Sequence, residues 1–258
     1  MLEEILRAKR REVDRRKASV LPAEIAARAR AAGETRGFRD ALLGVEVAII
    51  AEVKRRSPTA GELGGDRLLP AIARAYESGG ACALSVLTDA PYFGGQDGDL
   101  AACRAATDLP VLRKDFLIDP YQVVESRALG ADAVLLIVRA LPGSSLEELA
   151  ALAAEWRLDA LIEVHDEADL ERALLLPEPI IGINNRDLAS MTADLEVTER
   201  LVTHVPPWVT VVSESGIETR DDVERLVEAG VRVFLIGASL LKSGDPATKL
   251  KDLRGMLE

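Results

Sequence analysis

Short apolar runs recur eight times from residue 47 onward, and each is followed by a polar loop and an amphipathic segment. In these segments apolar residues return every three or four positions, which is the spacing of one helix face. Several segments end in glycine just before the next run, as a helix C-cap that leads into a strand does. Near-continuously apolar strands joined by helices predict a parallel sheet covered on both faces. The predicted strands lie at residues 47–53, 82–87, 110–114, 132–138, 159–164, 179–184, 209–214 and 231–237.

The eight units predict an α/β fold, a closed (β/α)8 TIM barrel. An open doubly wound sheet is disfavoured because no GxGxxG dinucleotide fingerprint follows the first strand. The chain has 258 residues, a usual length for one barrel, and we expect a single domain over residues 1–258. Residues 1–46 are expected to form one or two helices, broken near 31–37, that pack on the barrel as an N-terminal extension. No Pro/Ser-rich linker separates them from the first strand.

The first predicted helix is highly charged, with seven Lys/Arg and four Asp/Glu among residues 1–17. A solvated helical face is the favoured interpretation of this composition. A lid over an anionic substrate and a partner-binding helix remain as alternatives.

Charge and composition exclude several classes of protein. A net charge of -11 and a pI near 4.9 argue against general affinity for nucleic acid or for an anionic membrane, although a local basic pocket remains compatible. The longest apolar run, at 133–138, is far shorter than the ~18 residues of a membrane span, and the N-terminus lacks the apolar stretch of a signal peptide. The two cysteines form no CxxC motif. We expect a soluble cytoplasmic protein. The scarcity of Asn, Gln and Cys fits a thermophile, or equally the bias of a GC-rich genome.

Charged side chains stand where several predicted strands end. In IIAEVKRRSP, the two-residue period of a strand places Glu52 and Lys54 on one face. In a TIM barrel the active site forms at the C-terminal ends of the strands. Salt-bridged charges can also close a barrel end, but charges at one end of five strands favour a functional ring. Its predicted members are Lys54, Lys114, Glu52, Glu163, Glu214 and Asn184.

Two glycine-containing loops suggest a phosphate site. SESG at 213–216 and IGASLLKSG at 236–244 follow the last two strands, where phosphate sites of such barrels usually lie. The loop at 55–66 is either a mobile cover or a plain surface loop. Phe116 either stacks on an aromatic ligand or is a buried loop residue. His165 and His204 form no metal cluster or triad, and no catalytic role is expected for them.

The assembled motifs resemble those of the indole-3-glycerol phosphate synthase family. The matching stretches span nearly the whole chain in order: IIAEVKRRSP, LSVLTDAPYFGG, PVLRKDF, DAVLLIV, LIEVH, IIGINNRDL, VVSESGI and FLIGASLL. The resemblance implies a decarboxylating and dehydrating ring closure of 1-(2-carboxyphenylamino)-1-deoxyribulose 5-phosphate in tryptophan biosynthesis. It also implies a monomer that uses no metal or cofactor and has a small phosphorylated substrate as its partner.

By the same resemblance, Lys114 is the general acid at the substrate ketone, and partial desolvation would make it a usable donor. Lys54 would bind the substrate carboxylate and Glu163 would transfer protons during dehydration. The remaining polar residues, Glu52, Asn184 and Glu214, would orient this network.

The resemblance also assigns the two ends of the substrate. Ala238 stands where family members often carry serine, which removes one hydroxyl contact but keeps the backbone N–H. The implied phosphate contacts are Ser57, Arg186, Ser215, Gly216, Gly237 and Ala238. The implied aromatic pocket comprises Phe116, Leu87, Leu135, Leu188 and Leu235.

Two alternative functions fit the sequence less well. Phosphoribosylanthranilate isomerase shares the architecture but needs a Cys/Asp pair, and Cys82 opens its predicted strand at the wrong end. A non-catalytic phosphate binder predicts the loss of an acid or base, yet both lysines and all three glutamates are present.

Overall fold

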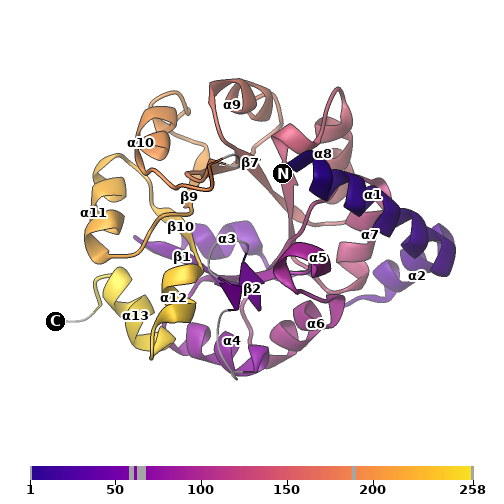
Figure 1. Cartoon of the computed structure of the whole chain (residues 1–258), viewed down its shortest axis with the longest axis horizontal. Helices are drawn as coiled ribbons and strands as arrows, with labels where there is room; N and C mark the ends of the chain where they lie inside the picture. The colour runs from indigo at the N-terminus through magenta and orange to yellow at the C-terminus, as the bar shows by residue number, and fades with distance from the viewer. Residues whose placement is uncertain (1, 58–60, 63–67, 188–189, 257–258) are drawn as a thin grey trace.

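A closed barrel of parallel strands forms the centre of the protein (Figure 1). The computed structural model describes residues 2–57, 61–62, 68–187 and 190–256. Within these residues the barrel order is β1-β10-β9-β8-β7-β6-β5-β4, so every strand pairs with its neighbours in the chain and the first pairs with the last. This confirms the predicted TIM barrel. The strands are β1 (Ala48–Val53), β4 (Ala83–Leu87), β5 (Val111–Lys114), β6 (Ala133–Ile137), β7 (Asp159–Val164), β8 (Ile180–Asn184), β9 (Thr210–Glu214) and β10 (Val233–Ile236).

Helices alternate with the strands and cover the outside of the barrel (Figure 1). Several begin with a side-chain cap; for example, Asp119 accepts a hydrogen bond from the backbone N–H of Tyr121. The covering helices are α4 (Leu69–Ser78), α6 (Asp97–Ala106), α7 (Pro120–Ala128), α8 (Ser145–Glu155), α9 (Glu167–Ala173), α10 (Glu196–Val202), α11 (Arg220–Glu228) and α13 (Pro246–Leu253). The loops carry β2 (Arg56–Ser57), β3 (Gly61–Glu62), α5 (Ala90–Phe93), η1 (Val138–Ala140) and α12 (Ala238–Lys242).

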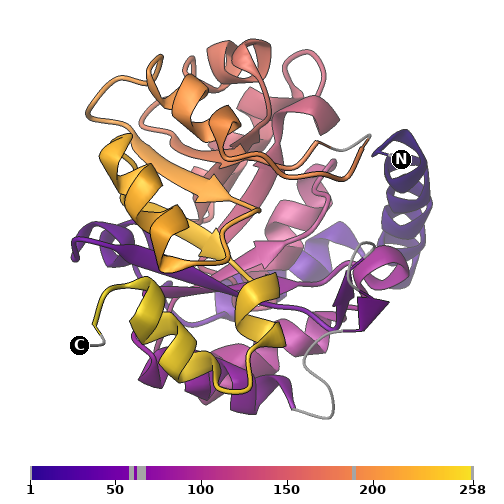
Figure 2. The same ribbon diagram turned by 60° about the vertical axis from the view of Figure 1, so that its left-hand side comes forward.

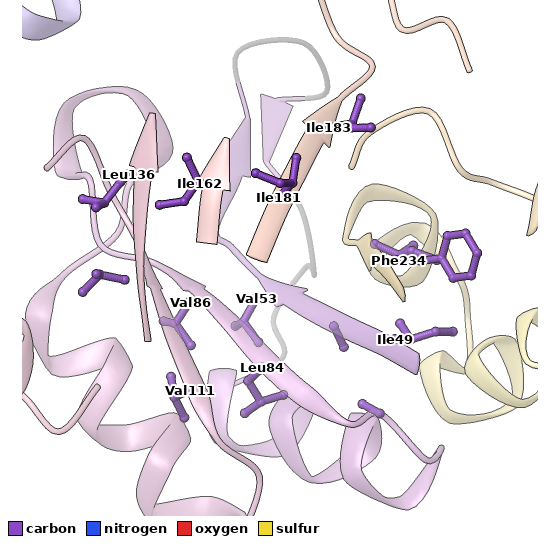
Figure 3. Close-up of a cluster of buried hydrophobic side chains, with 14 of the residues drawn as sticks. Ile49, Val53, Leu84, Val86, Val111, Leu136, Ile162, Ile181, Ile183 and Phe234 are labelled. Atoms are coloured by element: carbon purple, nitrogen blue, oxygen red, sulfur yellow. The ribbon is translucent and has the colours of Figure 1, made fainter. Parts of the chain in front are cut away.

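The strands separate two apolar layers. Alternate residues of β1, such as Ile49 and Val53, pack outward against the helices, and Figure 3 shows the corresponding residues of neighbouring strands in this outer layer. The residues between them, such as Ile50, pack inside the barrel with Leu112 and Leu161. Because side chains alternate along a strand, the inward set continues past Ile50 to Glu52 at the end where the strands terminate. This alternation delivers polar side chains to the barrel mouth.

The N-terminal extension contains three helices, α1 (Leu2–Ser19), α2 (Pro22–Ala31) and α3 (Phe38–Leu43). The six-residue α3 is a helix beyond the one or two that the sequence predicted. Its buried Phe38 and Leu42 belong to the inner apolar layer. The backbone N–H of Arg39 donates to Asp159 at the start of β7, at 3.0 Å. Helix α3 therefore closes the end of the barrel where the strands begin.

Helix α1 lies at the opposite end, and Figure 2 shows it on the same side of the molecule as β2. Lys9 is 1% exposed and pairs with Asp89 at 2.9 Å and with Asp115 at 2.8 Å, which lie within two residues of the ends of β4 and β5. Burial lowers the pKa of Lys9, but the two carboxylates outweigh it and raise the pKa above its usual value. Arg10 and Arg11 are exposed as expected. The prediction of a solvated helical face is therefore wrong for the face that carries Lys9.

None of the helices in the described part of the chain combines the length and apolar character needed to cross a membrane.

Candidate active site

The predicted ring of polar residues surrounds one cavity at the C-terminal ends of the strands. The cavity has a volume of about 550 Å³. Its lining includes all six predicted ring members, Glu52, Lys54, Lys114, Glu163, Asn184 and Glu214. They lie at or next to the C-terminal ends of β1, β5, β7, β8 and β9. At these ends the inward-facing side chains are polar and no longer apolar.

Lys114 is the centre of the charge network. Its Nζ donates to Glu214 Oε2 at 2.5 Å and lies 3.6 Å from Glu163 Oε2. Lys54 forms an ion pair with Glu52 beside it. Three groups that are far apart in the sequence, Lys54, Lys114 and Glu163, therefore share one cavity.

Burial and charge act in opposite directions on Lys114. Desolvation lowers the pKa of its ammonium group, but Glu214, Glu163 and Glu52 together outweigh burial and raise the pKa above its usual value. The sequence had suggested that desolvation would make this lysine an easier acid. The carboxylates hold the proton on Lys114, so the group is a charged hydrogen-bond donor at neutral pH.

The three glutamates differ in their environments. Burial raises the pKa of Glu214 to about 7; Glu163 and Glu52 add to the rise and Lys114 opposes it. Burial also acts to raise the pKa of Glu52, but Lys54 and Lys114 outweigh it, so the net shift is downward. Glu52 is therefore held ionised, whereas Glu214 can carry a proton near neutral pH.

Two glycines give these carboxylates their space. A Cβ on Gly182, in β8, would collide with Oε1 of Glu214. A Cβ on Gly237, just after β10, would lie 2.6 Å from Oε1 of Glu52 and 2.9 Å from its Cβ. Any larger residue at either position would displace a carboxylate from the network.

Five of the six predicted phosphate contacts line the same cavity. Arg186 lines it, with its backbone N–H donating to Asn184 Oδ1 at 3.1 Å and its guanidinium donating to the Met191 carbonyl at 2.6 Å. The backbone at Ser215 and Gly216 is left-handed, with φ of 67° and 82°. Ser57 lies in β2, and its side chain falls outside the described residues. The cavity lining also includes Ser215, Gly216, Gly237 and Ala238.

An apolar wall faces the charged groups. Leu188, which was predicted here, lies outside the described residues. The sequence did not single out Phe93 of α5, whose ring centroid is 6.4 Å from that of Phe116, nor Leu2 and Ile5 of α1. Phe93 stands inside the matching stretch LSVLTDAPYFGG, which was an available signal, whereas no local pattern places α1 over the mouth. The predicted members of this wall are Phe116, Leu87, Leu135 and Leu235.

Two further buried side chains lie beside this network. His165, for which the sequence suggested no role, is buried with Nε2 3.3 Å from Glu163 Oε1 and Nδ1 3.5 Å from Asp169 Oδ2. Arg113 points outward from β5 and bonds Glu125 at 3.0 Å between the sheet and the helices. Strand alternation, which places residues 163 and 165 on the same face, was the available signal for His165.

Across the residues that the structure describes, His, Cys, Asp and Glu side chains form no group of three or more arranged to hold a metal ion.

Comparisons with known proteins identify the family of the chain. The sequence model of the family described as indole-3-glycerol phosphate synthase matches residues 2–253. An indole-3-glycerol phosphate synthase of Rhizorhabdus wittichii is 49% identical over 257 residues, which cover 98% of this chain and 97% of the relative. The protein of that name from Rhodospirillum rubrum is 46% identical over 260 residues, 99% of each chain.

A more distant solved structure shares only the fold. The thiamine phosphate pyrophosphorylase of Pyrococcus furiosus has a TM-score of 0.59 at 18% identity, covering 82% of this chain and 95% of that one. The family match and these relatives cover almost the whole chain. The chain belongs to the indole-3-glycerol phosphate synthase family.

Proposed function

We propose that this chain converts 1-(2-carboxyphenylamino)-1-deoxyribulose 5-phosphate into indole-3-glycerol phosphate, carbon dioxide and water, a step of tryptophan biosynthesis. The observation that carries the proposal is the meeting of Lys54, Lys114 and Glu163 in one cavity. Family membership supports the same conclusion. Ring closure, decarboxylation and dehydration involve no net change of oxidation state, so acid and base groups suffice without a redox cofactor.

The substrate presents two anionic groups on either side of an aromatic ring and a polar chain. A protein with net charge -11 can hold such a molecule only through locally placed cations and amides. Lys54, Lys114 and Arg186 supply cations in the cavity, and Phe116 and Leu135 belong to its apolar wall. Few polar anchors within an apolar lining are typical of small-molecule sites.

Lys114 is the proposed general acid of ring closure. The aromatic carbon that bears the carboxylate forms a bond to the ketone carbon, and the ketone oxygen takes a proton from Lys114. The raised pKa of Lys114 keeps this proton in place until the oxygen gains negative charge. Loss of carbon dioxide then returns the bonding electrons to the ring system.

Glu163 is the proposed proton-transfer partner of the dehydration. The new hydroxyl leaves as water after protonation, and removal of a proton from the ring system restores aromaticity. Glu163 lies 3.6 Å from Lys114, so the two groups can act on neighbouring atoms of one intermediate. Because these groups interact, their protons belong to the network as a whole.

The other polar residues are proposed to hold these groups and the substrate in place. Lys54 binds the substrate carboxylate and can share in proton delivery, and its ion pair with Glu52 fixes its direction. Asn184 orients substrate hydroxyl or amino groups, and Glu214 holds Lys114 through the 2.5 Å hydrogen bond.

The phosphate is proposed to bind Arg186 and the backbone N–H groups of Ser215, Gly216, Gly237 and Ala238. Helix α12 has five residues, so its contribution is that of individual N–H groups rather than of a long helix dipole. Ser57 is proposed as a further contact. Leu188 is proposed to complete the aromatic pocket.

The proposal also includes the domain organisation, the oligomeric state and the location of the protein. Residues 1–258 are proposed to form one barrel domain, with 1–46 as its extension. A monomer in the cytoplasm is the proposed state. The competing isomerase function is disfavoured because Cys82 immediately precedes β4, at the end of the barrel opposite the cavity.

The test incubates purified protein with the carboxyphenylamino substrate, in buffer containing a metal chelator, and follows the appearance of indole fluorescence. Turnover without added metal is the expected result. A parallel incubation with phosphoribosylanthranilate tests the isomerase. Absence of indole product at stoichiometric enzyme, or turnover in the isomerase assay alone, would reject the proposal.

A further inference from the structure

A buried polar network lies behind the phosphate side of the cavity. Asn185 is 2% exposed and follows β8, with its side chain on the face opposite that of Asn184. Its Oδ1 accepts from the backbone N–H of Thr198 at 3.1 Å and from the Thr198 hydroxyl at 2.7 Å. Its Nδ2 donates to Ser213 Oγ at 3.0 Å and to the Ser215 carbonyl at 3.0 Å. The Thr198 N–H can only donate and the Ser215 carbonyl can only accept, so the network fixes the direction of the Asn185 amide.

Ser215 needs such a support. Its φ of 67° lies in the left-handed region, which is costly for a residue with a Cβ. Strained backbone of this kind persists where the surroundings hold it, often at ligand sites. Asn185 bonds directly to the Ser215 carbonyl. Ser215 and the following Gly216 both line the cavity.

The bond to Ser215 also sets the direction of the next N–H. Every described peptide bond is trans, so the carbonyl of Ser215 and the N–H of Gly216 point in opposite directions across one peptide plane. Asn185 holds the carbonyl on the outer side of the sheet, where Thr198 of α10 packs. The Gly216 N–H is thereby directed toward the cavity.

We propose that Asn185 is a positioning residue for substrate phosphate, acting by holding the left-handed Ser215 so that the Gly216 N–H faces the bound anion. The inference rests on the proposed function for the identity of the ligand as a phosphate ester. Asn185 itself touches no substrate. Its effect is on binding, because the phosphate is remote from the reacting ketone and ring.

The first test compares Asn185→Ala with the wild type and with Thr198→Val. The probes are inorganic phosphate, titrated by calorimetry, and the phosphorylated substrate, followed by steady-state kinetics. In Asn185→Ala the Kd of phosphate and the KM should both rise about tenfold, as for one lost hydrogen bond to an anion, while kcat stays within about threefold. Thr198→Val removes a hydroxyl from the same network without touching the bond to Ser215. Its phosphate Kd should stay within about twofold of wild type.

A second variant separates positioning from packing. Glycine adopts left-handed conformations at little cost, so Ser215→Gly in the Asn185→Ala background should recover at least about threefold of the lost phosphate affinity. The backbone N–H groups are unchanged by this substitution. No recovery in the double variant, or an equal loss in Thr198→Val, would show that Asn185 only supports packing and would overturn the proposal.

A measurement on the wild type covers the case in which Asn185→Ala does not fold. The amide resonance of Gly216 should shift strongly when inorganic phosphate is added, and an unmoved resonance overturns the proposal. Phosphate binding is measured without turnover, so the proposed enzymatic function and the proposed role of Asn185 can be rejected independently. Asn185-dependent binding without indole product would reject the enzymatic function alone, whereas normal turnover with an unchanged KM in Asn185→Ala would reject this inference alone.

Discussion

Lys114 shows how much of the site depends on single side chains. Its ammonium group contacts glutamates from two other strands, Glu214 of β9 and Glu163 of β7. Neighbouring carboxylates raise the pKa of Lys114 against the effect of burial, whereas burial itself raises the pKa of Glu214 to about 7. At this scale function depends on the distances between a few atoms.

Lys114→Ala is expected to lower kcat by about 10²–10⁴-fold, the usual contribution of a general acid. Binding of the substrate should persist, because the phosphate contacts and the apolar wall are untouched. Single-turnover kinetics and equilibrium titration with the substrate separate the two effects. A variant that keeps near-normal kcat would remove Lys114 from the mechanism.

Gly182→Ala is expected to lower kcat/KM by about 10²-fold, since an added Cβ pushes the Glu214 carboxylate away from Lys114. Gly98→Ala is the matched control. Gly98 lies in α6, and a Cβ added there would have no neighbouring atom within 4 Å. The control should retain activity and gain up to about 1 kcal/mol of stability from the better helix former. Equal activities of the two variants would contradict the proposed spacing requirement.

At the scale of elements, α1 is held to the barrel by ion pairs as well as by apolar contact. Lys9 reaches Asp89 and Asp115, while Arg16 lies 2.5 Å from Asp97 and 2.9 Å from Glu125. These partners belong to segments that follow β4 and β5. The same helix brings Leu2 and Ile5 to the cavity, so the ion pairs join the extension to the site.

Lys9→Met is expected to lower the free energy of unfolding by about 3–5 kcal/mol, because it leaves the buried Asp89 carboxylate without its cation and removes one of the two cations beside Asp115. Arg28→Met is the control on α2, where Arg28 and Glu24 form an ion pair with both side chains more than half exposed. The control should cost less than about 1 kcal/mol. Urea unfolding at neutral pH measures both, and a Lys9→Met variant as stable as the control would show that this contact does not anchor α1.

At the scale of the whole molecule, stability depends on the two apolar layers of the barrel and also on buried charged side chains. Asp115 belongs to this buried set. Burial raises the pKa of its carboxyl, but Arg113 and Lys9 outweigh it and lower the pKa to about 2. A carboxyl whose pKa is lowered in the folded state stabilises the fold above its unfolded pKa of 3.8. That stabilisation is lost as the pH falls through 2.

Between pH 4 and pH 2 the wild type should therefore lose about 2 kcal/mol of stability through Asp115 alone. Asp115→Asn cannot show this loss. At pH 5 this variant should have a lower free energy of unfolding than the wild type. At pH 2 the difference between the two proteins should be about 2 kcal/mol smaller. Urea unfolding across this pH range measures the gap. A constant gap would mean that the pKa of Asp115 is not lowered in the folded state.

Local patterns in the sequence were sufficient to predict the strands, the barrel and the inward direction of the charged strand ends. The reason is that strand alternation and helix periodicity depend on near neighbours in the chain. The two-residue period of a strand is enough to place Glu52 and Lys54 on one face. The meeting of Lys114 with Glu163 followed only once the sheet was assumed to close.

The tertiary structure decided what depends on contacts between distant segments. The position of α1 is set by Lys9 and its two aspartates, and no local period in residues 1–17 encodes that choice. The left-handed turn at Ser215 is held by Asn185, 30 residues earlier in the chain. Such placements depend on which polar groups find partners after the barrel closes, because a buried polar group is stable only when another segment supplies its partner.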